Sequence, residues 1–220
     1  MALWDWNYFF EILPEIFGAL RITLALTLFA TIVAYTLGLL LAIGRRSSNR
    51  WISWPVAGLV EFIRSTPLLV QLYFLYFVLP DFGILWDGFI VSVVALGLHN
   101  STYASECYRA GIEHVSKGQW EAARALNFSP ARTLTTIVIP QAIRVALPSL
   151  VNTTIGMFKD TAIVSLVGVI EIMAKAQMIA ADGARAVEPY MIVGLMYLTL
   201  SFISANGARR LERRLAVAGG

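Results

Sequence analysis

Ionisable side chains interrupt the apolar stretches of this chain, and their chemistry needs an explanation. Glu61 and Arg64 lie three residues apart in one such stretch, so a helix would carry them on one face. Charged groups in lipid are costly, so the pair either reaches the headgroups near a membrane surface or faces a polar pathway. We favour a pathway or a contact with a partner protein.

A second polar run begins at His99 and continues through Asn100 and Ser101. Serine and threonine side chains often hydrogen-bond the backbone of their own helix, so Ser101 by itself indicates little. The combination of His99 with Asn100 favours a polar cavity, although a structural role stays open. Glu106 and Arg109 follow at a spacing that allows pairing along one helix face.

Lys159, Asp160 and Thr161 separate two further apolar stretches, and Arg144 is embedded in the first of them. Membrane transporters commonly build substrate sites where a helix is interrupted at membrane depth. The three residues are therefore candidates for such a break. The alternative is that Lys159 and Asp160 form a structural ion pair.

The motifs of several enzyme classes are missing from the sequence. It contains no Gly-x-x-x-x-Gly-Lys-Ser/Thr phosphate loop, no His-Glu-x-x-His zinc motif and no Gly-x-Ser-x-Gly elbow. The single cysteine, Cys107, excludes an internal disulfide and a multi-cysteine zinc site, and two histidines are too few for a metal site. We expect no catalytic residue, metal or cofactor in this chain.

The composition is that of a membrane protein. Of the 220 residues, 58% are hydrophobic and 14% are charged, whereas soluble domains carry about 25% charged residues. The net charge of +3 could indicate nucleic-acid binding, but the basic residues flank apolar segments, where membrane topology explains them. Acidic residues near the start argue against a cleavable signal peptide.

The hydropathy pattern predicts one all-α domain over residues 1–220 with about five transmembrane helices. Each predicted span is close to the roughly 20 apolar residues that cross a bilayer. The spans are residues 20–44, 55–79, 88–108, 133–158 and 189–208. Residues 1–17 are interpreted as an interfacial amphipathic segment, and residues 171–188 as an outside loop or a surface helix.

Basic residues predict the orientation of these spans. Arg45, Arg46 and Arg50 follow the first span, and four arginines follow the last one at positions 209, 210, 213 and 214. Loops rich in arginine and lysine stay in the cytoplasm. The N-terminus is therefore expected outside and the C-terminus inside.

The segment 117–130 then lies on the cytoplasmic side, between the third and fourth spans. Residues 121–126 favour a helix, and the alanines among them leave one side with little bulk, so that another protein could approach closely. Asn127 tolerates a left-handed backbone and can end this helix, and Pro130 cannot continue it far.

This segment resembles the EAA loop of permease subunits in binding-protein-dependent ABC importers. Matching residues are Glu121, Ala122, Ala123, Ile137 and Pro140. The sequence departs from the pattern where Asn127 replaces a glycine and Ile139 replaces a leucine. Asparagine also adopts left-handed turns, so the geometry is retained.

Further blocks are similar to those of polar amino-acid permeases. They include residues 61–71, 108–112, 117–120 with Gly118, and 158–161, and together they cover most of the chain. The N-terminal Trp4-Asp5-Trp6 and the Leu98-His99 block most resemble the permease subunits for ectoine and hydroxyectoine.

The resemblance implies a MetI-like type I importer permease in a bacterial inner membrane. Its partners would be two ATPase subunits that use ATP, a second permease copy or sister permease, and an extracytoplasmic binding protein. The EAA helix would sit in a groove of an ATPase subunit, with Glu121 pairing with basic residues there and Ala122 and Ala123 permitting close docking. Gly118, Asn127 and Pro140 complete the predicted coupling site.

The substrate implied by the resemblance is a small zwitterion, whose carboxylate and cation need opposite charges in the pathway. Arg64 would bind the carboxylate through a bidentate contact. The complete predicted pathway consists of Glu61, Arg64, Asn100, Ser101, Glu106, Lys159, Asp160 and Thr161. Glutamate, glutamine, arginine or histidine are alternative substrates. A passive channel and a membrane-embedded enzyme are alternatives of another class.

Overall fold

The computed structural model describes residues 4–217, and the regular elements in that range are helical. The helices are α1 (Trp6–Arg45), α2 (Arg50–Ser65), α3 (Leu68–Tyr73), α4 (Gly88–His114), α5 (Lys117–Ala125), α6 (Pro130–Thr133), α7 (Ile139–Asp160), α8 (Ile172–Gly183) and α9 (Val187–Val217). Residues 1–3 and 218–220 of the predicted domain lie outside the description, as do the side chains at 211, 212 and 214–217, including Arg214. Within these limits the all-α prediction is confirmed.

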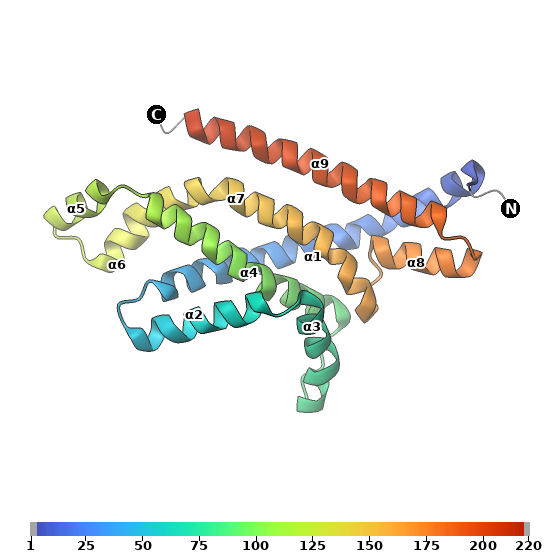
Figure 1. Ribbon diagram of the computed structural model, residues 1–220, viewed down its shortest axis with the longest axis horizontal. Helices are drawn as coiled ribbons and strands as arrows, with labels where there is room; N and C mark the ends of the chain where they lie inside the picture. The colour runs from blue at the N-terminus through green and yellow to red at the C-terminus, as the bar shows by residue number, and fades with distance from the viewer. Residues whose placement is uncertain (1–3, 218–220) are drawn as a thin grey trace.

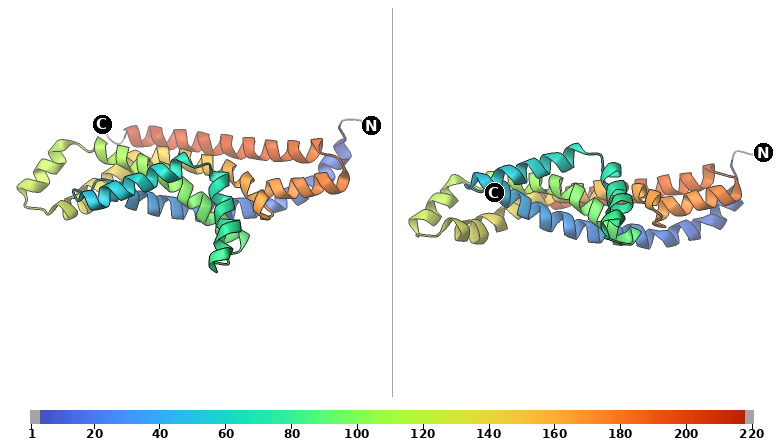
Figure 2. Two further views of the ribbon diagram at one scale, coloured as in Figure 1. Left: turned by 60° about the horizontal axis from the view of Figure 1, so that its bottom comes forward. Right: turned by 90° about the horizontal axis from the view of Figure 1, so that it is seen from below.

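The molecule is elongated (Figures 1 and 2). Helices α1, α4, α7 and α9 run along its length, whereas α5 and α6 occupy one end and α8 and the N-terminus occupy the other. Helix α3 projects sideways from this bundle, as the views in Figure 2 also show. The helix expected at residues 117–130 therefore lies at one end of the long axis.

Helices α1 and α4 form the most extensive contact of the fold. The buried face of α1 repeats a small residue every four positions, at Ala30, Ala34, Gly38 and Ala42. Small residues let two backbones approach closely, which is how membrane helices associate without a hydrophobic driving force. A Cβ atom at Gly38 would lie 2.7 Å from the Cβ of Ala104.

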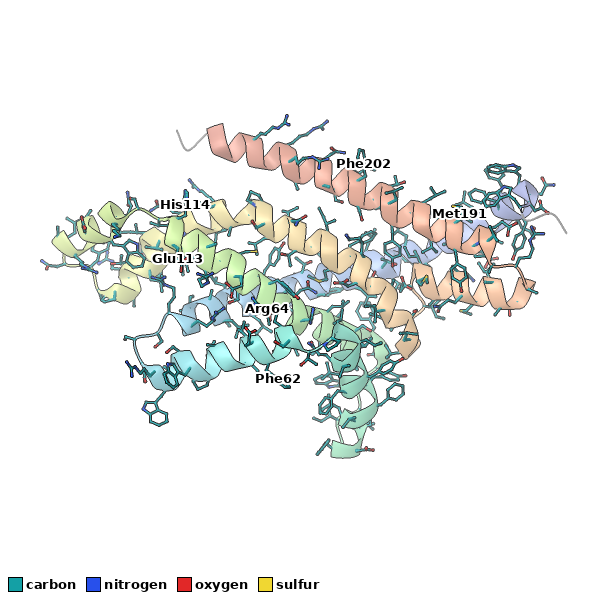
Figure 3. All side chains as sticks on the ribbon, in the orientation of Figure 1. Phe62, Arg64, Glu113, His114, Met191 and Phe202 are labelled. Carbon is teal, nitrogen blue, oxygen red and sulfur yellow. The ribbon has the colours of Figure 1, made fainter. Side chains whose placement is uncertain are left out.

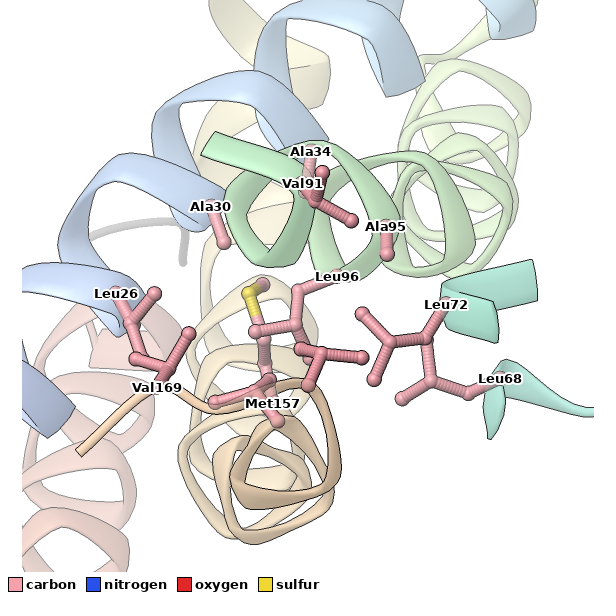
Figure 4. Packing of buried hydrophobic residues seen from close by; sticks show 12 residues of the cluster. Leu26, Ala30, Ala34, Leu68, Leu72, Val91, Ala95, Leu96, Met157 and Val169 are labelled. Carbon is pink, nitrogen blue, oxygen red and sulfur yellow. The ribbon is translucent and has the colours of Figure 1, made fainter. Parts of the chain in front are cut away.

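The central core joins four parts of the chain (Figure 4). Leu26 on α1, Leu96 on α4, Leu72 on α3 and Met157 on α7 pack together, each no more than 1% exposed. Val169, from the segment before α8, completes one side of this cluster. The core therefore fixes the bundle near its middle, between the two ends that carry α5 and α8.

Three helical segments are long and apolar enough to cross a membrane, namely Trp6–Arg45, Pro130–Val167 and Val187–Arg210. The segment from α2 to Phe82 adds a fourth if its two bent halves count as one span. Helix α4, at predicted span 88–108, is long enough, but its polar run makes it too polar to be counted with them. The crossing by α4, and with it the number five, stays a prediction.

Predicted span 55–79 is broken into two helices that meet at an angle of 102°. Pro67 causes the break, because proline lacks an N–H and forces the preceding residue out of helical geometry. Thr66 accordingly has an extended backbone, with φ −98° and ψ 131°. The Gln71 amide nitrogen donates to the carbonyl oxygens of Ile63 at 2.7 Å and Thr66 at 2.9 Å. It thereby supplies a donor to Thr66 O at the end of the helix and a second donor to Ile63 O, which also accepts from the N–H of Thr66 at 3.3 Å.

Replacement of Gln71 by leucine is expected to destabilise this bend. Thr66 O would lose its donor and Ile63 O would keep only the N–H of Thr66. An unsatisfied buried polar group costs about 1–3 kcal/mol, and these partly buried carbonyl groups should lie toward the lower end of that range. The melting temperature of the purified permease should fall. Gln177→Leu on α8 changes the same residue type at a site of similar exposure, without a hydrogen bond across a helix break. A similar loss in both variants would contradict the capping role of Gln71.

One irregular helical segment lies within predicted span 133–158, and a second follows shortly after its end. A π-helical turn, Leu134–Val138, leads directly into Pro140 in the first turn of α7, and Pro148 lies within α7. After Asp160 the α-helix gives way to a 3₁₀ segment, Thr161–Val167, which ends at Gly168 with φ 78°. The interruption expected at Lys159–Thr161 is thus a change of helix type and not a loop.

Helix α8 packs with both long terminal helices in a second hydrophobic cluster. Ile172 and Ala176 of α8 contact the cluster formed by Ile16 of α1 and Ile192 of α9, and all four are at most 1% exposed. The expected interfacial segment 1–17 is, from Trp6 onward, the first part of the continuous helix α1. The segment expected as an outside loop or surface helix at 171–188 contains helix α8, a short link and the start of α9. Helix α8 is exposed on one side, at Met178 and Asp182, but Glu171 before it and Glu188 after it are buried, at 0% and 1% exposed.

Candidate functional site

The predicted coupling segment forms helix α5 followed by a left-handed turn. Asn127 has φ 56°, which confirms the expected helix stop. The backbone N–H of Asn127 donates to Arg124 O at 2.9 Å, and that of Phe128 to Ala123 O at 3.0 Å. Helix α6 starts immediately afterward, because the Ser129 side chain accepts from the N–H of Arg132.

The exposed face of α5 differs from the expected one at one position. Glu121 and Ala122 are exposed, but Ala123 is only 1% exposed and faces the protein's own interior. The small side chain at 123 therefore lets α5 lie close to its own chain. The surface open to a partner instead consists of Glu121, Ala122 and Ala125, together with Leu126, which is 69% exposed.

Helix α5 is attached to the ends of α4 and α7. Trp120 packs against a buried cluster that contains Ile112 and Val115 at the end of α4 and Val138 and Ala142 around the start of α7. The Arg46 guanidinium lies 5.8 Å from the centre of the Trp120 ring, within reach of a cation–π contact. A force on α5 would thus reach two helices of the bundle directly.

Two other predicted coupling residues, Gly118 in α5 and Pro140 in α7, are exposed. Gly118 is exposed in the first turn of α5, where an added Cβ would meet nothing closer than 4.0 Å, so close packing within the chain does not require glycine there. Pro140 is exposed at the start of α7.

A cluster of opposite charges lies where α1, α2 and α4 meet, and it unites three predicted pathway residues. Glu106 forms an ion pair with Arg45, a second with Arg109 at 2.8 Å and a third with Arg64 at 3.7 Å. Arg64 also pairs with Glu61 at 3.7 Å. The sequence pattern predicted Glu61, Arg64 and Glu106, but not that Arg45, from the end of α1, would join them.

Arg64 is the least tightly held cation of this cluster. Its contacts to Glu61 and Glu106 are both longer than a hydrogen bond, and its side chain is 38% exposed. Figure 3 labels Arg64 and Phe62 on α2, and Glu113 and His114 where α4 leads toward α5. Glu106 and Arg109 of the cluster therefore lie on α4, the helix that precedes the coupling helix α5 in the chain.

Asn100 and Ser101 are buried in the contact faces of α4. The Asn100 amide donates to Leu96 O at 3.0 Å, and the Ser101 hydroxyl to Leu98 O at 2.7 Å, both within their own helix. Nearby, the Gln71 amide lies 3.1 Å from Nδ1 of His99. The structure does not bring Asn100 or Ser101 into the hydrogen bonds of the Glu106 cluster, and their contact with substrate stays a prediction.

Lys159, Asp160 and Thr161 differ in exposure at the junction of α7 with the 3₁₀ segment. Lys159 is exposed, Asp160 is half-buried and Thr161 is fully buried. Within the described residues Lys159 and Asp160 form no ion pair with each other, so the alternative of a structural pair finds no support. The Thr161 hydroxyl donates to Phe158 O and contacts Tyr197 on α9.

Two cavities bring together charged residues that sequence reasoning did not connect. One, of about 850 Å³, includes Glu15, Arg21 and Lys175 in its lining, and Lys175 pairs with Glu15 at 2.7 Å. Another, of about 510 Å³, lies between α4, α7 and α9 and includes Glu106 and Arg209. Proximity of residues so far apart in the chain gives no local signal in the sequence.

These features define a class of protein. A bundle of membrane-length helices carries at one end a short helix with an exposed carboxylate, and three of its helices bring together a cluster of half-buried and exposed opposite charges. Such an arrangement suits a transport subunit that is moved by a separate protein bound to the short helix.

Comparison with known proteins identifies the family. Residues 34–217 match the family described as binding-protein-dependent transport system inner membrane component, and the chain belongs to it. A probable amino-acid ABC transporter permease protein, y4tG, of Sinorhizobium fredii is 39% identical over 95% of this chain and 90% of its own length. The L-cystine transport system permease protein TcyB of Bacillus subtilis is 36% identical over 92% of this chain and 87% of its own.

Solved structures agree in fold. The crystal structure of an amino acid ABC transporter with histidines contains a chain that matches with a TM-score of 0.88 and 36% identity, covering 96% of this chain and 99% of that one. A chain of the MetNI methionine ABC transporter in an inward-facing conformation matches with a TM-score of 0.72 at 18% identity, over 91% and 94% of the two chains. The predicted MetI-like fold is confirmed.

The chain is therefore a multi-pass inner-membrane permease subunit of a binding-protein-dependent ABC importer for polar amino acids. It is not itself the ATPase. Membership of this family implies ATPase and binding-protein partners. The alternatives of a passive channel and a membrane-embedded enzyme are thereby set aside.

Proposed function

We propose that this permease carries a small zwitterion past Arg64 and Glu106 and that ATPase subunits drive it through Glu121 on α5. The observation that carries this proposal is the cluster in which Arg64 lies 3.7 Å from Glu106. An amino acid needs a cation for its carboxylate and an anion for its ammonium group. Arg64, which lies between the carboxylates of Glu106 and Glu61, offers both charges at adjacent positions.

The unequal bonding of the two groups supports separate roles. Arg64 is held only by the two long contacts, so it can turn toward a substrate carboxylate and bind it through two N–H groups. Glu106 would keep Arg45 and Arg109 as partners while Arg64 is engaged. Glu61, whose side chain is 67% exposed, is then free to meet the substrate cation.

The coupling role of α5 rests on its exposure and attachment. Glu121 is exposed and available to a basic residue of an ATPase subunit, while Trp120 ties the same helix to α4 and α7. Because Glu106 and Arg109 belong to α4, movement of α5 would shift one side of the charge cluster. Gly118, Ala122, Asn127 and Pro140 are proposed to shape the surface around Glu121.

The orientation and assembly are also proposals. The arginines after α1 and in α9 support a cytoplasmic position for α5 and for the C-terminus, with the N-terminus outside. A second permease copy or a sister permease would complete the pathway, since Phe62 on α2 is 70% exposed beside the charged pair Glu61–Arg64.

Arg64→Ala is expected to lower uptake about 10- to 100-fold, because a lost hydrogen bond to a charged group costs about 1.5–3 kcal/mol. Assembly with the ATPase should persist, since the cluster retains Arg45 and Arg109. ATP-driven uptake in proteoliposomes and co-purification of the ATPase are the two measurements. Arg50→Ala, at the exposed start of the same helix, is the matched control. Loss of assembly in Arg64→Ala would assign Arg64 to structure, and unchanged uptake would remove it from the pathway.

The particular substrate is a finer proposal. Ectoine or hydroxyectoine is the proposed ligand, and glutamate, glutamine, arginine and histidine are the competitors. The relatives named above are described by amino acids in general and by cystine, and neither is described by ectoine. Thermal stabilisation of the partner binding protein by each compound separates these candidates. Competition between the unlabelled compounds and the radiolabelled substrate for uptake then checks the assignment. Stabilisation by an amino acid but not by ectoines would reject the ectoine proposal.

A further inference from the structure

A buried carboxyl group lies where four helical elements meet at the end of the molecule that carries α8. Glu171 precedes α8 and is 0% exposed. Its Oε1 accepts a hydrogen bond from the backbone N–H of Ala174 at 2.8 Å, which caps the helix. Beside it, the backbone N–H of Ile172 donates to Oγ1 of Thr23 on α1 at 3.3 Å. The other oxygen, Oε2, lies 3.0 Å from the hydroxyl of Tyr197 on α9.

The contacts continue from Tyr197 into the 3₁₀ segment. The Tyr197 hydroxyl oxygen lies 3.2 Å from Oγ1 of Thr161, and Oγ1 lies 2.6 Å from the carbonyl oxygen of Phe158. A carbonyl oxygen can only accept, so the single hydroxyl proton of Thr161 must point to Phe158. In the contact between Tyr197 and Thr161, the donor is therefore Tyr197.

The number of protons then decides the state of Glu171. Tyr197 has one hydroxyl proton, and a carboxylate has none to give. If Glu171 were ionised, Tyr197 would donate to it, and two oxygen lone pairs would face each other between Tyr197 and Thr161. If Oε2 carries a proton, Glu171 donates to Tyr197, Tyr197 donates to Thr161, and Thr161 donates to Phe158. Only the protonated carboxyl group satisfies all three contacts.

We propose that Glu171 is protonated in this conformation and is a positioning residue, which holds Tyr197 against Thr161 and fixes the junction of α7, α8 and α9. The inference concerns the contacts among α7, α8 and α9 at this junction, and it does not require Thr161 to touch substrate. It adds to the proposed function a protonated group that stabilises one conformation of the permease.

The charges around the junction agree with a neutral carboxyl group. The titratable groups on the elements packed around it include Tyr197 and Glu188 on α9, Lys175 and Asp182 on α8, Glu11, Glu15 and Arg21 on α1, and Lys159 and Asp160 at the end of α7. Lys175 is paired with Glu15. Within the described residues no cation forms an ion pair with Glu171. A buried carboxylate without a paired cation is costly, so the group takes up a proton instead.

Burial raises the pKa of the Glu171 carboxyl, and the hydrogen bonds that it accepts offset this only in part. Because the pKa is higher in the folded protein than in the unfolded chain, the stabilising contribution is complete below the unfolded pKa. It is lost as the pH rises through the folded pKa. The junction should therefore be weakest in alkaline solution.

Glutamine at position 171 imitates the protonated carboxyl group and not the ionised one. Its Oε1 can accept from Ala174 while its Nε2 donates to Tyr197, and the side chain is of nearly equal size. Glu171→Gln in the complete transporter is expected to retain uptake and melting temperature at neutral pH. In alkaline solution the melting temperature of the natural protein should fall more than that of Glu171→Gln.

Matched variants and a spectroscopic measurement complete the test. Glu171→Ala should lower both uptake and melting temperature, whereas Glu15→Gln, which neutralises an exposed carboxylate nearby, should leave the alkaline loss unchanged. Infrared difference spectra should show the carbonyl band of a protonated carboxylic acid, absent from Glu171→Gln. The proposal is overturned if that band is missing in the natural protein, or if Glu171→Gln loses as much uptake and stability at neutral pH as Glu171→Ala.

Discussion

Glu121→Lys is expected to remove most ATP-driven uptake while the permease stays folded and inserted. Glu121 is exposed, and within the described residues it forms no ion pair with its own chain, so reversal of its charge breaks no internal contact. The proposed contact with a basic residue of the ATPase would become a repulsion. Loss of a charge-assisted contact of about 1.5–3 kcal/mol corresponds to at least a tenfold loss of coupling.

The control for this experiment is Asp182→Lys. Asp182 is an exposed carboxylate on α8, at the other end of the molecule, so the same change of charge occurs far from the coupling helix. Uptake in proteoliposomes should fall in Glu121→Lys and persist in Asp182→Lys. The amount of ATPase that co-purifies with the permease should likewise be lower for Glu121→Lys than for Asp182→Lys. Normal uptake by Glu121→Lys would show that Glu121 does not couple the two proteins.

Gly111→Ala should strongly destabilise the contact between α4 and α7. A Cβ atom at position 111 would overlap the backbone carbonyl oxygen of Ala142, which cannot rotate away, and would lie 3.3 Å from the Cβ of Ala146. The two helices would have to separate, at a cost typical of an overpacked core of about 1–3 kcal/mol or more. Because α5 is attached to the same two helix ends, the loss should appear in uptake as well as in melting temperature.

Gly156→Ala supplies the comparison within α7. A Cβ atom at position 156 would meet nothing within 4 Å, and alanine in a helix interior is more stable than glycine by roughly 0.5–1 kcal/mol. This variant should therefore match or exceed the natural protein in melting temperature. If Gly111→Ala melts at the same temperature as Gly156→Ala, the close approach of α4 and α7 is not required for folding.

Local sequence chemistry was sufficient to predict the coupling helix and its end. Alanine-rich helix formers followed by asparagine specify a helix and a left-handed stop, and Asn127 has that geometry. The inward direction of Ala123 was not predictable in the same way. Which alanine of a short helix faces its own protein depends on how Trp120 docks against α4 and α7, and those contacts join residues distant in the chain.

The break at Pro67 and the position of α8 show the limit of hydropathy. An apolar stretch of sufficient length reads as one span, but the missing N–H of Pro67 ends α2 and lets α3 leave at 102°. The charged residues of 171–188 predicted exposure, whereas Glu171 is buried, where it accepts a hydrogen bond from the N–H of Ala174 and contacts the hydroxyl group of Tyr197. The presence of one charged residue in the sequence does not reveal that its hydrogen-bond partners come from other helices.

Three of the eight predicted pathway residues, namely Glu61, Arg64 and Glu106, lie in one charge cluster whose arrangement the sequence did not predict. Glu61 and Arg64 were paired by their spacing, and the structure retains that pair. Their contact with Glu106, and the presence of Arg45 on the same carboxylate, depend on three helices meeting at one place. The spacing of residues within one helix does not indicate which other helices it contacts.

The length of α1 sets a limit on how the permease sits in its membrane. At 1.5 Å per residue, the 40 residues of α1 extend about 60 Å, whereas the hydrocarbon layer is about 30 Å thick. Complete immersion would need a tilt of about 60°, beyond the range of roughly 0–40° that membrane helices adopt. At the largest of these tilts, about 14 residues of α1 still stand clear of the hydrocarbon. The uncharged stretch nearest Arg45 is the part of α1 best suited to lipid. We therefore expect the Glu15–Lys175 pair to lie outside the hydrocarbon layer, among water and headgroups.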